Sequence, residues 1–140
     1  MSESDAVQML VDQWLKFAHA DLNAGRTLSV NRATNSPETA CFHAQQAAEK
    51  AIKALLVKVQ IASMKGHDLS NLTKLLPTRF SNTRDLPSLA GLVPYAVAAR
   101  YPVAHAGDPM QLDTGPTWDE ADEALLLAER TVRAVEADLS

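Results

Sequence analysis

The chain has 140 residues, a hydrophobic fraction of 46% and a formal net charge of −4 at pH 7. This length allows one domain with a hydrophobic core, at residues 1–140, and the apolar content excludes an intrinsically disordered chain. The single cysteine, Cys41, excludes an internal disulfide and a cysteine-based metal cluster, and the net acidity argues against a broad, nonspecific nucleic-acid binder.

The N-terminal segment has the apolar spacing of an amphipathic helix. The residues that share this spacing are Val7, Leu10, Val11, Trp14, Phe17, Ala18, Leu22 and Leu28. Ser4 is a suitable N-cap because its hydroxyl can accept a bond from a free backbone N–H, and the acidic Asp5 favours the positive end of a helix. We therefore expect a long helix that begins at Ser4 and ends before the stretch NRATNSP, residues 31–37.

A second long helix is expected after Ser36, where a serine N-cap is followed by Pro37 at the first helical position and by the acidic Glu38. Its apolar side is rich in alanine, so a neighbouring helix can approach it closely. This side comprises Ala40, Cys41, Ala44, Ala48, Ala51, Ile52, Leu55, Leu56 and Val59. The opposite, polar side carries His43, Gln46, Lys50 and Lys53.

Two further helices are expected in the middle of the chain. The stretch KGHDLSNLTKLLP, residues 65–77, predicts a glycine turn and then a short helix. The inward residues of this helix are Leu69, Leu72, Leu75 and Leu76. Residues 86–99 also have helical apolar spacing, but Pro94 lacks an N–H and must kink or restart that helix, which Pro102 ends.

The C-terminal part is predicted to contain a loop and a last long helix. Residues 104–116, AHAGDPMQLDTGP, show no helical pattern and are expected to form the loop. Thr117 and Glu120 have the spacing of a capping box, in which the two side chains satisfy free backbone N–H groups at a helix start. The apolar stripe that follows is Ala121, Ala124, Leu125, Ala128, Val132, Val135 and Leu139.

All of these expected elements are helices, and no segment shows the period-two alternation of a strand. The fold is therefore predicted to be all-α, an up-and-down bundle of four long helices plus one short helix in a single domain at residues 1–140. No apolar run reaches the roughly 20 residues of a membrane-spanning helix. The N-terminus lacks a signal-peptide pattern, so we expect a cytoplasmic protein without a membrane contact.

Charge is unevenly distributed along the chain. Residues 50–84 carry seven Lys/Arg against one acid, whereas residues 108–140 carry two arginines against nine acids. The basic segment could receive a phosphate or an acidic partner. Alternatively, it could face the acidic segment within the fold or across a dimer.

Three stretches, in this order, resemble the HEPN domain family (higher eukaryotes and prokaryotes nucleotide-binding). They are ACFHAQQAAEKAIKALLV from residue 40, GHDL from residue 66 and LVPYAVAARYPV from residue 92, and an alanine-rich last helix follows them. WLKFAHADL, from residue 14, is similar to the first helix of that family. The resemblance extends from Trp14 to about Val135, and the RYP stretch resembles the branch that is associated with nucleotidyltransferases.

The resemblance implies a five-helix bundle that dimerises, and it implies one of two functions. Many HEPN proteins are the partner of a minimal nucleotidyltransferase, in a toxin–antitoxin-like pair, with a suspected role in binding a nucleotide or substrate. Others are metal-independent RNases, often toxins. The motif of these RNases is an arginine, a polar residue, a few further residues and a histidine.

The stretch RYPVAH, residues 100–105, has the spacing of the RNase motif but lacks its setting. Arg100 could hold a phosphate with two hydrogen bonds, and His105 could transfer a proton at a 2′-hydroxyl. However, Tyr101 stands at the polar position, and Pro102 prevents one continuous helix from presenting both side chains. We therefore expect His105 in a loop and do not favour catalysis. Arg100 and Tyr101 equally suit a helix C-terminus that Pro102 turns.

A nucleotide- or phosphate-binding pocket is another use of the polar residues. The candidates are His43, Gln46, Lys50, His67, Arg100 and Tyr101. The first three lie on one stripe at i, i+3 and i+7, and the fourth stands at the next helix start, where backbone N–H groups favour an anion. The same residues could instead form a solvated face that fixes the bundle. The histidines lack metal-ligand spacing, so neither a metal nor another cofactor is expected.

The sequence thus predicts a HEPN-type homodimer that is not an enzyme by itself, binds a nucleotide and partners a nucleotidyltransferase. The dimer is expected because residues 86–99 carry apolar side chains on two sides, more than one bundle interior needs. One alternative is an endoribonuclease toxin that acts on RNA through Arg100 and His105. A second alternative is a helical interaction module without a small ligand.

Overall fold

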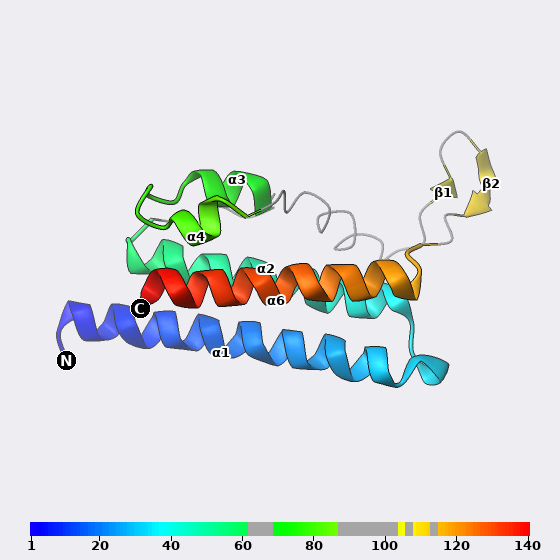
Figure 1. Cartoon of the computed structure of the whole chain (residues 1–140), viewed down its shortest axis with the longest axis horizontal. Coiled ribbons are helices and arrows are strands. Elements are labelled where there is room, and N and C mark those ends of the chain that lie inside the picture. The colour runs from blue at the N-terminus through cyan, green and yellow to red at the C-terminus, as the bar shows by residue number, and fades with distance from the viewer. Residues whose placement is uncertain (62–68, 87–103, 106–107, 113–114) are drawn as a thin grey trace.

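The computed structural model describes residues 1–61, 69–86, 104–105, 108–112 and 115–140. Within these ranges, three long helices lie lengthwise beside one another (Figure 1): α1 (Glu3–Val30), α2 (Pro37–Lys58) and α6 (Trp118–Leu139). A three-residue 3-10 helix, η1 (Arg32–Thr34), leads from α1 toward α2. The helix α1 runs antiparallel to the other two, so the N- and C-termini lie at the same end of the bundle (Figure 1). The predicted all-α fold is confirmed.

The starts of the long helices follow local capping chemistry. The Ser36 hydroxyl accepts a hydrogen bond from the N–H of Thr39, and Thr117 and Glu120 form the predicted capping box at the start of α6. The prediction for α1 was wrong by two residues, because Ser2 is the N-cap and forms its own capping box with Asp5. Since the two serines stand in the same polar stretch, only the backbone path distinguishes them.

The core of the bundle is built around the alanine-rich side of α2. Its six alanines are fully buried: Ala40, Ala44, Ala47, Ala48, Ala51 and Ala54. The neighbouring helices approach so closely that a Cβ on Gly25 of α1 would lie 2.5 Å from Cδ2 of Leu125 of α6 and 3.4 Å from the carbonyl oxygen of Ala40. Small residues therefore set the spacing of the three helices. None of the helices in the described ranges is both long and apolar enough to cross a membrane.

The apolar stripe predicted for α1 is only partly turned inward. Val11, Ala18 and Leu22 are buried as expected, but Leu10 is 49% exposed and Phe17 is 45% exposed. The stripe is wider than the face that α2 and α6 cover, so its edge stays on the surface of the described structure.

Two short helices, α3 (Leu69–Lys74) and α4 (Ser81–Arg84), pack at the end of the bundle where α2 and α6 end (Figure 1). The sequence predicted α3 but no helix at α4. The backbone and hydroxyl of Thr83 bond to Asp138 near the end of α6. This tertiary contact, rather than an apolar pattern, holds the turn of α4.

Residues 104–116 also differ from the prediction, because part of the expected loop is a small antiparallel hairpin. Its strands are β1 (Ala104–His105) and β2 (Asp108–Leu112), with Ala104 opposite Leu112 and His105 opposite Asp108. A two-residue strand is too short to show period-two alternation in the sequence. The pairing of β1 with β2 is made by backbone hydrogen bonds, which the side-chain pattern does not predict. The predicted helix at residues 86–99 lies almost entirely outside the described residues, and the fourth long helix stays a prediction.

Candidate functional site

A carboxylate on α1 joins two of the predicted site residues on α2. Oδ1 of Asp21 lies 2.9 Å from Nδ1 of His43, and Oδ2 of Asp21 lies 2.5 Å from Nζ of Lys50. The side chain of Asp21 is only 13% exposed, and those of His43 and Lys50 are 27% exposed. His43 and Lys50 are two helical turns apart, so one carboxylate can bridge both of them only from the neighbouring helix. We call these three residues the Asp21 cluster.

The packing beside the Asp21 cluster explains why α1 and α2 meet there. Gly25 lies one turn after Asp21 on α1, and a Cβ on it would be 3.5 Å from Cβ of His43. The close approach brings the short aspartate side chain within reach of α2. The ring of Phe42 meets the ring of His43 edge-on, with centroids 5.8 Å apart. The imidazole is therefore held by a carboxylate and an aromatic neighbour.

A second polar network runs along the adjacent side of α2. Nε2 of Gln46 donates to Oε1 of Gln45 at 2.7 Å, and Nε2 of Gln45 donates to Oε2 of Glu49 at 3.1 Å. Glu49 is also 3.2 Å from Nζ of Lys53, whose ammonium lies 5.3 Å from the ring centroid of Trp14 on α1. Gln45 and Glu49 are almost fully buried, at 3% and 8% exposure. Burial of such polar groups is favourable only with partners of this kind.

Within the part of the chain that the structure describes, one ring nitrogen of His43 has no hydrogen-bond partner. Its Nδ1 is bonded to Asp21, whereas the described residues provide no hydrogen-bond partner for its Nε2. A histidine whose one nitrogen is fixed by a carboxylate can use the other nitrogen for a ligand or a proton. The Asp21 cluster can therefore bind and orient a polar group.

The structure describes only part of the predicted binding set. It brings His43 and Lys50 together through Asp21, and it places Gln46 in the neighbouring network rather than in the Asp21 cluster. His67, Arg100 and Tyr101 are outside the described residues, so their part in the pocket stays a prediction. The backbone of His105 lies in strand β1, which pairs with β2, so the prediction that His105 lies in a loop was wrong.

Asp21 is the functional residue that sequence reasoning missed. It interrupts the apolar stripe of α1, four residues after Phe17 and seven after Trp14. A carboxylate in such a position is costly unless a cation or a donor meets it. That interruption is the signal in the sequence that could have pointed to a partner on another helix.

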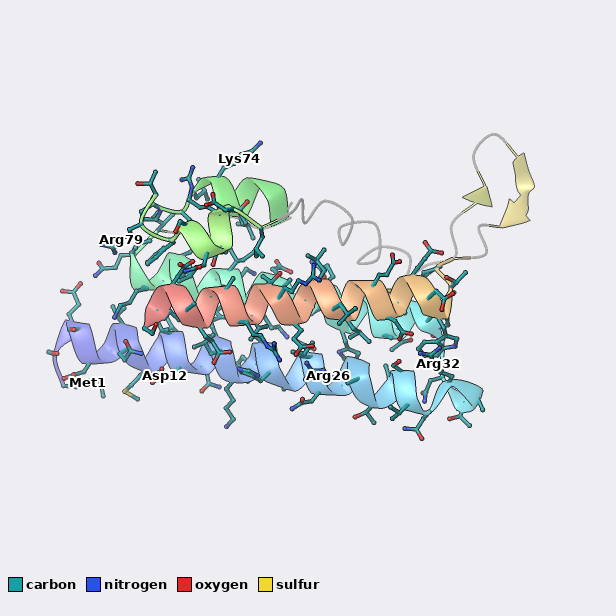
Figure 2. All side chains as sticks on the ribbon, in the orientation of Figure 1. Met1, Asp12, Arg26, Arg32, Lys74 and Arg79 are labelled. Carbon is teal, nitrogen blue, oxygen red and sulfur yellow. The ribbon has the colours of Figure 1, made fainter. Side chains whose placement is uncertain are left out.

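The acidic C-terminal segment does not neutralise the basic middle segment by any ion pair within the described ranges. Its carboxylates pair with the N-terminal region: Glu136 with His19 at 3.3 Å, Glu129 with Arg26 at 2.8 Å and Asp122 with Arg32 at 2.5 Å. Figure 2 shows Arg26 and Arg32 on the α1 side of the bundle. Lys74 and Arg79 point outward at the end that α3 and α4 cover. These three ion pairs do not join the two charged segments, which meet instead through the hydrogen bonds of Asn82 and Thr83 to Asp138.

Two of these surface pairs lower the pKa of their carboxyls. The hydrogen bond from Ser29, and then the nearby Arg32 guanidinium, hold the pKa of Asp122 below its ordinary value. The hydrogen bond from Arg26 does the same for the pKa of Glu129, with a further contribution from the charge of Arg133. An open groove of about 440 Å³ lies between these pairs on α1 and α6. Its charged residues are already paired, so the groove offers no free charge to a phosphate.

Cys41 is not a nucleophile. Its side chain is fully buried, and this burial, together with the charges of Glu120 and Glu38, raises the pKa of its thiol to about 12. A thiol of this kind stays protonated and inert near neutral pH. In the ranges that the structure describes, no group of three or more His, Cys, Asp or Glu side chains is placed to hold a metal ion.

Comparison with known proteins points to one family. A family model described as the HEPN domain matches residues 11–138. The crystal structure of TT1696 from Thermus thermophilus is similar with a TM-score of 0.74 and 32% identity, covering 91% of this chain and 97% of that one. ST0689, an archaeal HEPN homologue, is similar with a TM-score of 0.64 and 28% identity, covering 93% of this chain and 98% of that one. No curated protein matches the chain at a significant level.

Proposed function

Because the chain belongs to the HEPN domain family, we propose that it is a nucleotide-binding helical protein that acts as the accessory partner of a minimal nucleotidyltransferase. The pair would be of the toxin–antitoxin type, with the HEPN protein as a homodimer. In this proposal the chain binds a nucleotide or substrate and does not itself carry out the chemistry.

The observation that carries the proposal is the Asp21 cluster. Here one carboxylate from α1, only 13% exposed, holds His43 and Lys50 in fixed positions. Inter-helix bonds of this kind fit both a binding site and a polar face that fixes the bundle, and the ligand titration below distinguishes the two. Pre-positioned polar groups at the edge of an apolar core are the usual composition of a small-ligand site. The predicted contributions of His67, Arg100 and Tyr101 would extend this site.

The described part of RYPVAH supports the non-catalytic interpretation over the RNase alternative. An RNase centre of this family would present the arginine and the histidine from one helix. The backbone at Ala104–His105 is extended and paired with β2, so a helix does not continue through His105. The RNase alternative is nevertheless a distinct outcome of the experiments below.

The exposed edge of α1 supports a dimer. Leu10 is 49% exposed and Phe17 is 45% exposed, and their spacing of seven residues places them on the same face of α1. Large apolar side chains gathered on one helix are typical of a surface that another protein covers. A second copy of the chain is the occupant that the family resemblance favours. The dimer would then form beside the Asp21 cluster, since Phe17 is one turn from Asp21.

Isothermal titration of the purified protein with nucleoside triphosphates tests the nucleotide-binding part. The wild type should bind, and His43→Ala should weaken binding about tenfold or more, the effect of one lost hydrogen bond in a site. The matched control is His19→Ala, since His19 also lies on a long helix but pairs with Glu136 at the surface and is not part of the Asp21 cluster. Equal weakening by both variants would show that His43 is not specifically part of the binding site. No binding by the wild type, with and without its partner, would favour the interaction-module alternative.

The nucleotidyltransferase part is tested by the neighbouring gene. If it encodes a small nucleotidyltransferase, the two purified proteins should form a complex on size-exclusion chromatography. The transferase should also modify a substrate faster in that complex than alone. A neighbouring nucleotidyltransferase that neither binds the protein nor changes its rate would contradict the accessory role.

A further inference from the structure

We infer that Asp21 is a positioning residue that keeps the proton of the neutral His43 ring on Nδ1, so that Nε2 is a hydrogen-bond acceptor for a neutral donor group of the ligand. The donor would be a sugar hydroxyl or an exocyclic amine of a nucleoside, and not its phosphate. The identity of the ligand rests on the proposed function, whereas the role of Asp21 is independent of it.

The hydrogen-bond geometry fixes the proton. Nδ1 of His43 lies 2.9 Å from Oδ1 of Asp21, which is the distance of a normal hydrogen bond. An ionised carboxylate only accepts, and its other oxygen already accepts from Nζ of Lys50 at 2.5 Å. The donor in the first bond is therefore Nδ1–H. In the neutral ring the second nitrogen, Nε2, then carries a lone pair and no proton.

The charges of the site argue against a phosphate at Nε2. Asp21 and Lys50 neutralise each other, and Lys53 on the adjacent side of α2 is paired with Glu49. With a neutral imidazole, the Asp21 cluster has no net positive charge. A phosphate needs uncompensated cations or N–H donors, whereas an imidazole lone pair repels it. With the ring neutral, the cluster therefore suits the neutral part of a nucleotide, and Lys50 holds Asp21 in place.

The partial burial of the cluster makes it selective for a ligand that places a hydrogen-bond donor at Nε2. A polar group that loses water without gaining a partner costs more than an exposed one. His43 is only 27% exposed, its Nδ1 is already occupied, and no residue in the described ranges bonds to its Nε2, so a ligand that covers the ring would need to satisfy Nε2. A ligand with a hydroxyl or an amine at this point does so, and one without such a donor leaves the lone pair buried and unpaired.

Nitrogen-15 NMR of the imidazole rings tests the positioning role without any ligand. At a pH at which the ring is neutral, His43 should be protonated at Nδ1 in the wild type. In Asp21→Ala it should change to the Nε2–H form that histidines in water prefer. The signal of His19, assigned with His19→Gln, should stay unchanged and serves as the control. A wild-type His43 with its proton on Nε2 would overturn the inference, whether or not the variant folds.

Titration of the wild type with matched ligands tests the donor. Adenosine should bind, 2′,3′-dideoxyadenosine should test the sugar hydroxyls, and purine riboside should test the exocyclic amine. The analogue that lacks the donor group in contact with Nε2 should bind about tenfold more weakly than adenosine. Inorganic phosphate should not bind at His43. If all three nucleosides bind equally, or if phosphate alone shifts the His43 signals, the inference is wrong although the protein binds nucleotides. Failure of every ligand would contradict the proposed function, while the NMR result still decides the role of Asp21.

Discussion

Asp138 holds Thr83 with two hydrogen bonds to a single carboxylate oxygen, from the Thr83 backbone N–H at 2.8 Å and from its hydroxyl at 2.7 Å. The other oxygen accepts from the backbone N–H and the side-chain amide of Asn82, at 3.2 Å and 2.8 Å. Thr83 is fully buried. The start of α4 is thus attached to the end of α6 by one side chain.

Asp138→Ala should therefore lower the free energy of unfolding by about 2 kcal/mol, because it leaves the buried donors of Thr83 without a partner. Urea denaturation measures the change. The control is Glu136→Ala, which removes a carboxylate from the same part of α6 but breaks only the surface contact with His19, a pair worth about 0.5 kcal/mol or less. Equal effects of the two variants would show that Asp138 is not specifically required.

Gly25→Val should destabilise the protein by about 1–3 kcal/mol, as overpacking of a core does. A Cβ at this position would already be 2.5 Å from Cδ2 of Leu125 and 3.4 Å from the backbone oxygen of Ala40, so a branched side chain fits only if the buried Leu125 side chain is displaced or the helices move apart. Ala20→Val is the matched control, since it adds a β-branched residue to the exposed side of the same helix. In thermal unfolding, the melting temperature should fall clearly for Gly25→Val and stay close to that of the wild type for Ala20→Val.

Stability should fall as the pH drops below about 4, the range in which carboxyls titrate. The pKa values of Asp122 and Glu129 are lowered in the folded protein by their hydrogen bonds with Ser29, Arg32 and Arg26. A lowered folded pKa means that the stabilisation is present above the unfolded pKa and is lost on protonation. Asp122→Asn should be less stable than the wild type at neutral pH, and the difference should narrow in acid. A constant difference across the pH range would contradict this linkage.

Phe17→Asp should convert the protein from a dimer to a monomer. A charge in the centre of the exposed apolar edge of α1 cannot be buried against a second copy without a large desolvation cost. Sedimentation should give twice the chain mass of 15.1 kDa for the wild type and the chain mass for the variant. Val30→Asp is the control, because Val30 is 80% exposed at the far end of α1. A wild type that sediments as a monomer at micromolar concentration would exclude the dimer.

The purified protein should leave structured and single-stranded RNA intact in the absence of metal ions. The reason is that β1 keeps the backbone at His105 extended, and Tyr101 and Pro102 depart from the RNase pattern. Gel analysis of RNA incubated with the protein gives the result directly. Cleavage that leaves 2′,3′-cyclic phosphate ends, and that is lost in both Arg100→Ala and His105→Ala, would establish the enzyme alternative.

Features that depend on neighbouring residues along the chain could be predicted from the sequence. The capping residues Ser36 and Thr117 act on N–H groups within the next helical turn, so their positions alone specify two helix starts. The alanine-rich side of α2 likewise follows from residue spacing, because an α-helix places every third or fourth residue on one face. These local rules also supported the all-α class, which the structure confirms.

The tertiary structure decided what depends on the distance between helices. Asp21 and His43 are 22 positions apart, and their contact exists because Gly25 and the alanines of α2 let α1 approach closely. The same packing leaves Phe17 exposed, although its spacing alone would place it inside. Helical periodicity gives the angle at which a side chain leaves its own helix, but burial and bonding depend on where the next helix lies, and that position results from the packing of the whole core.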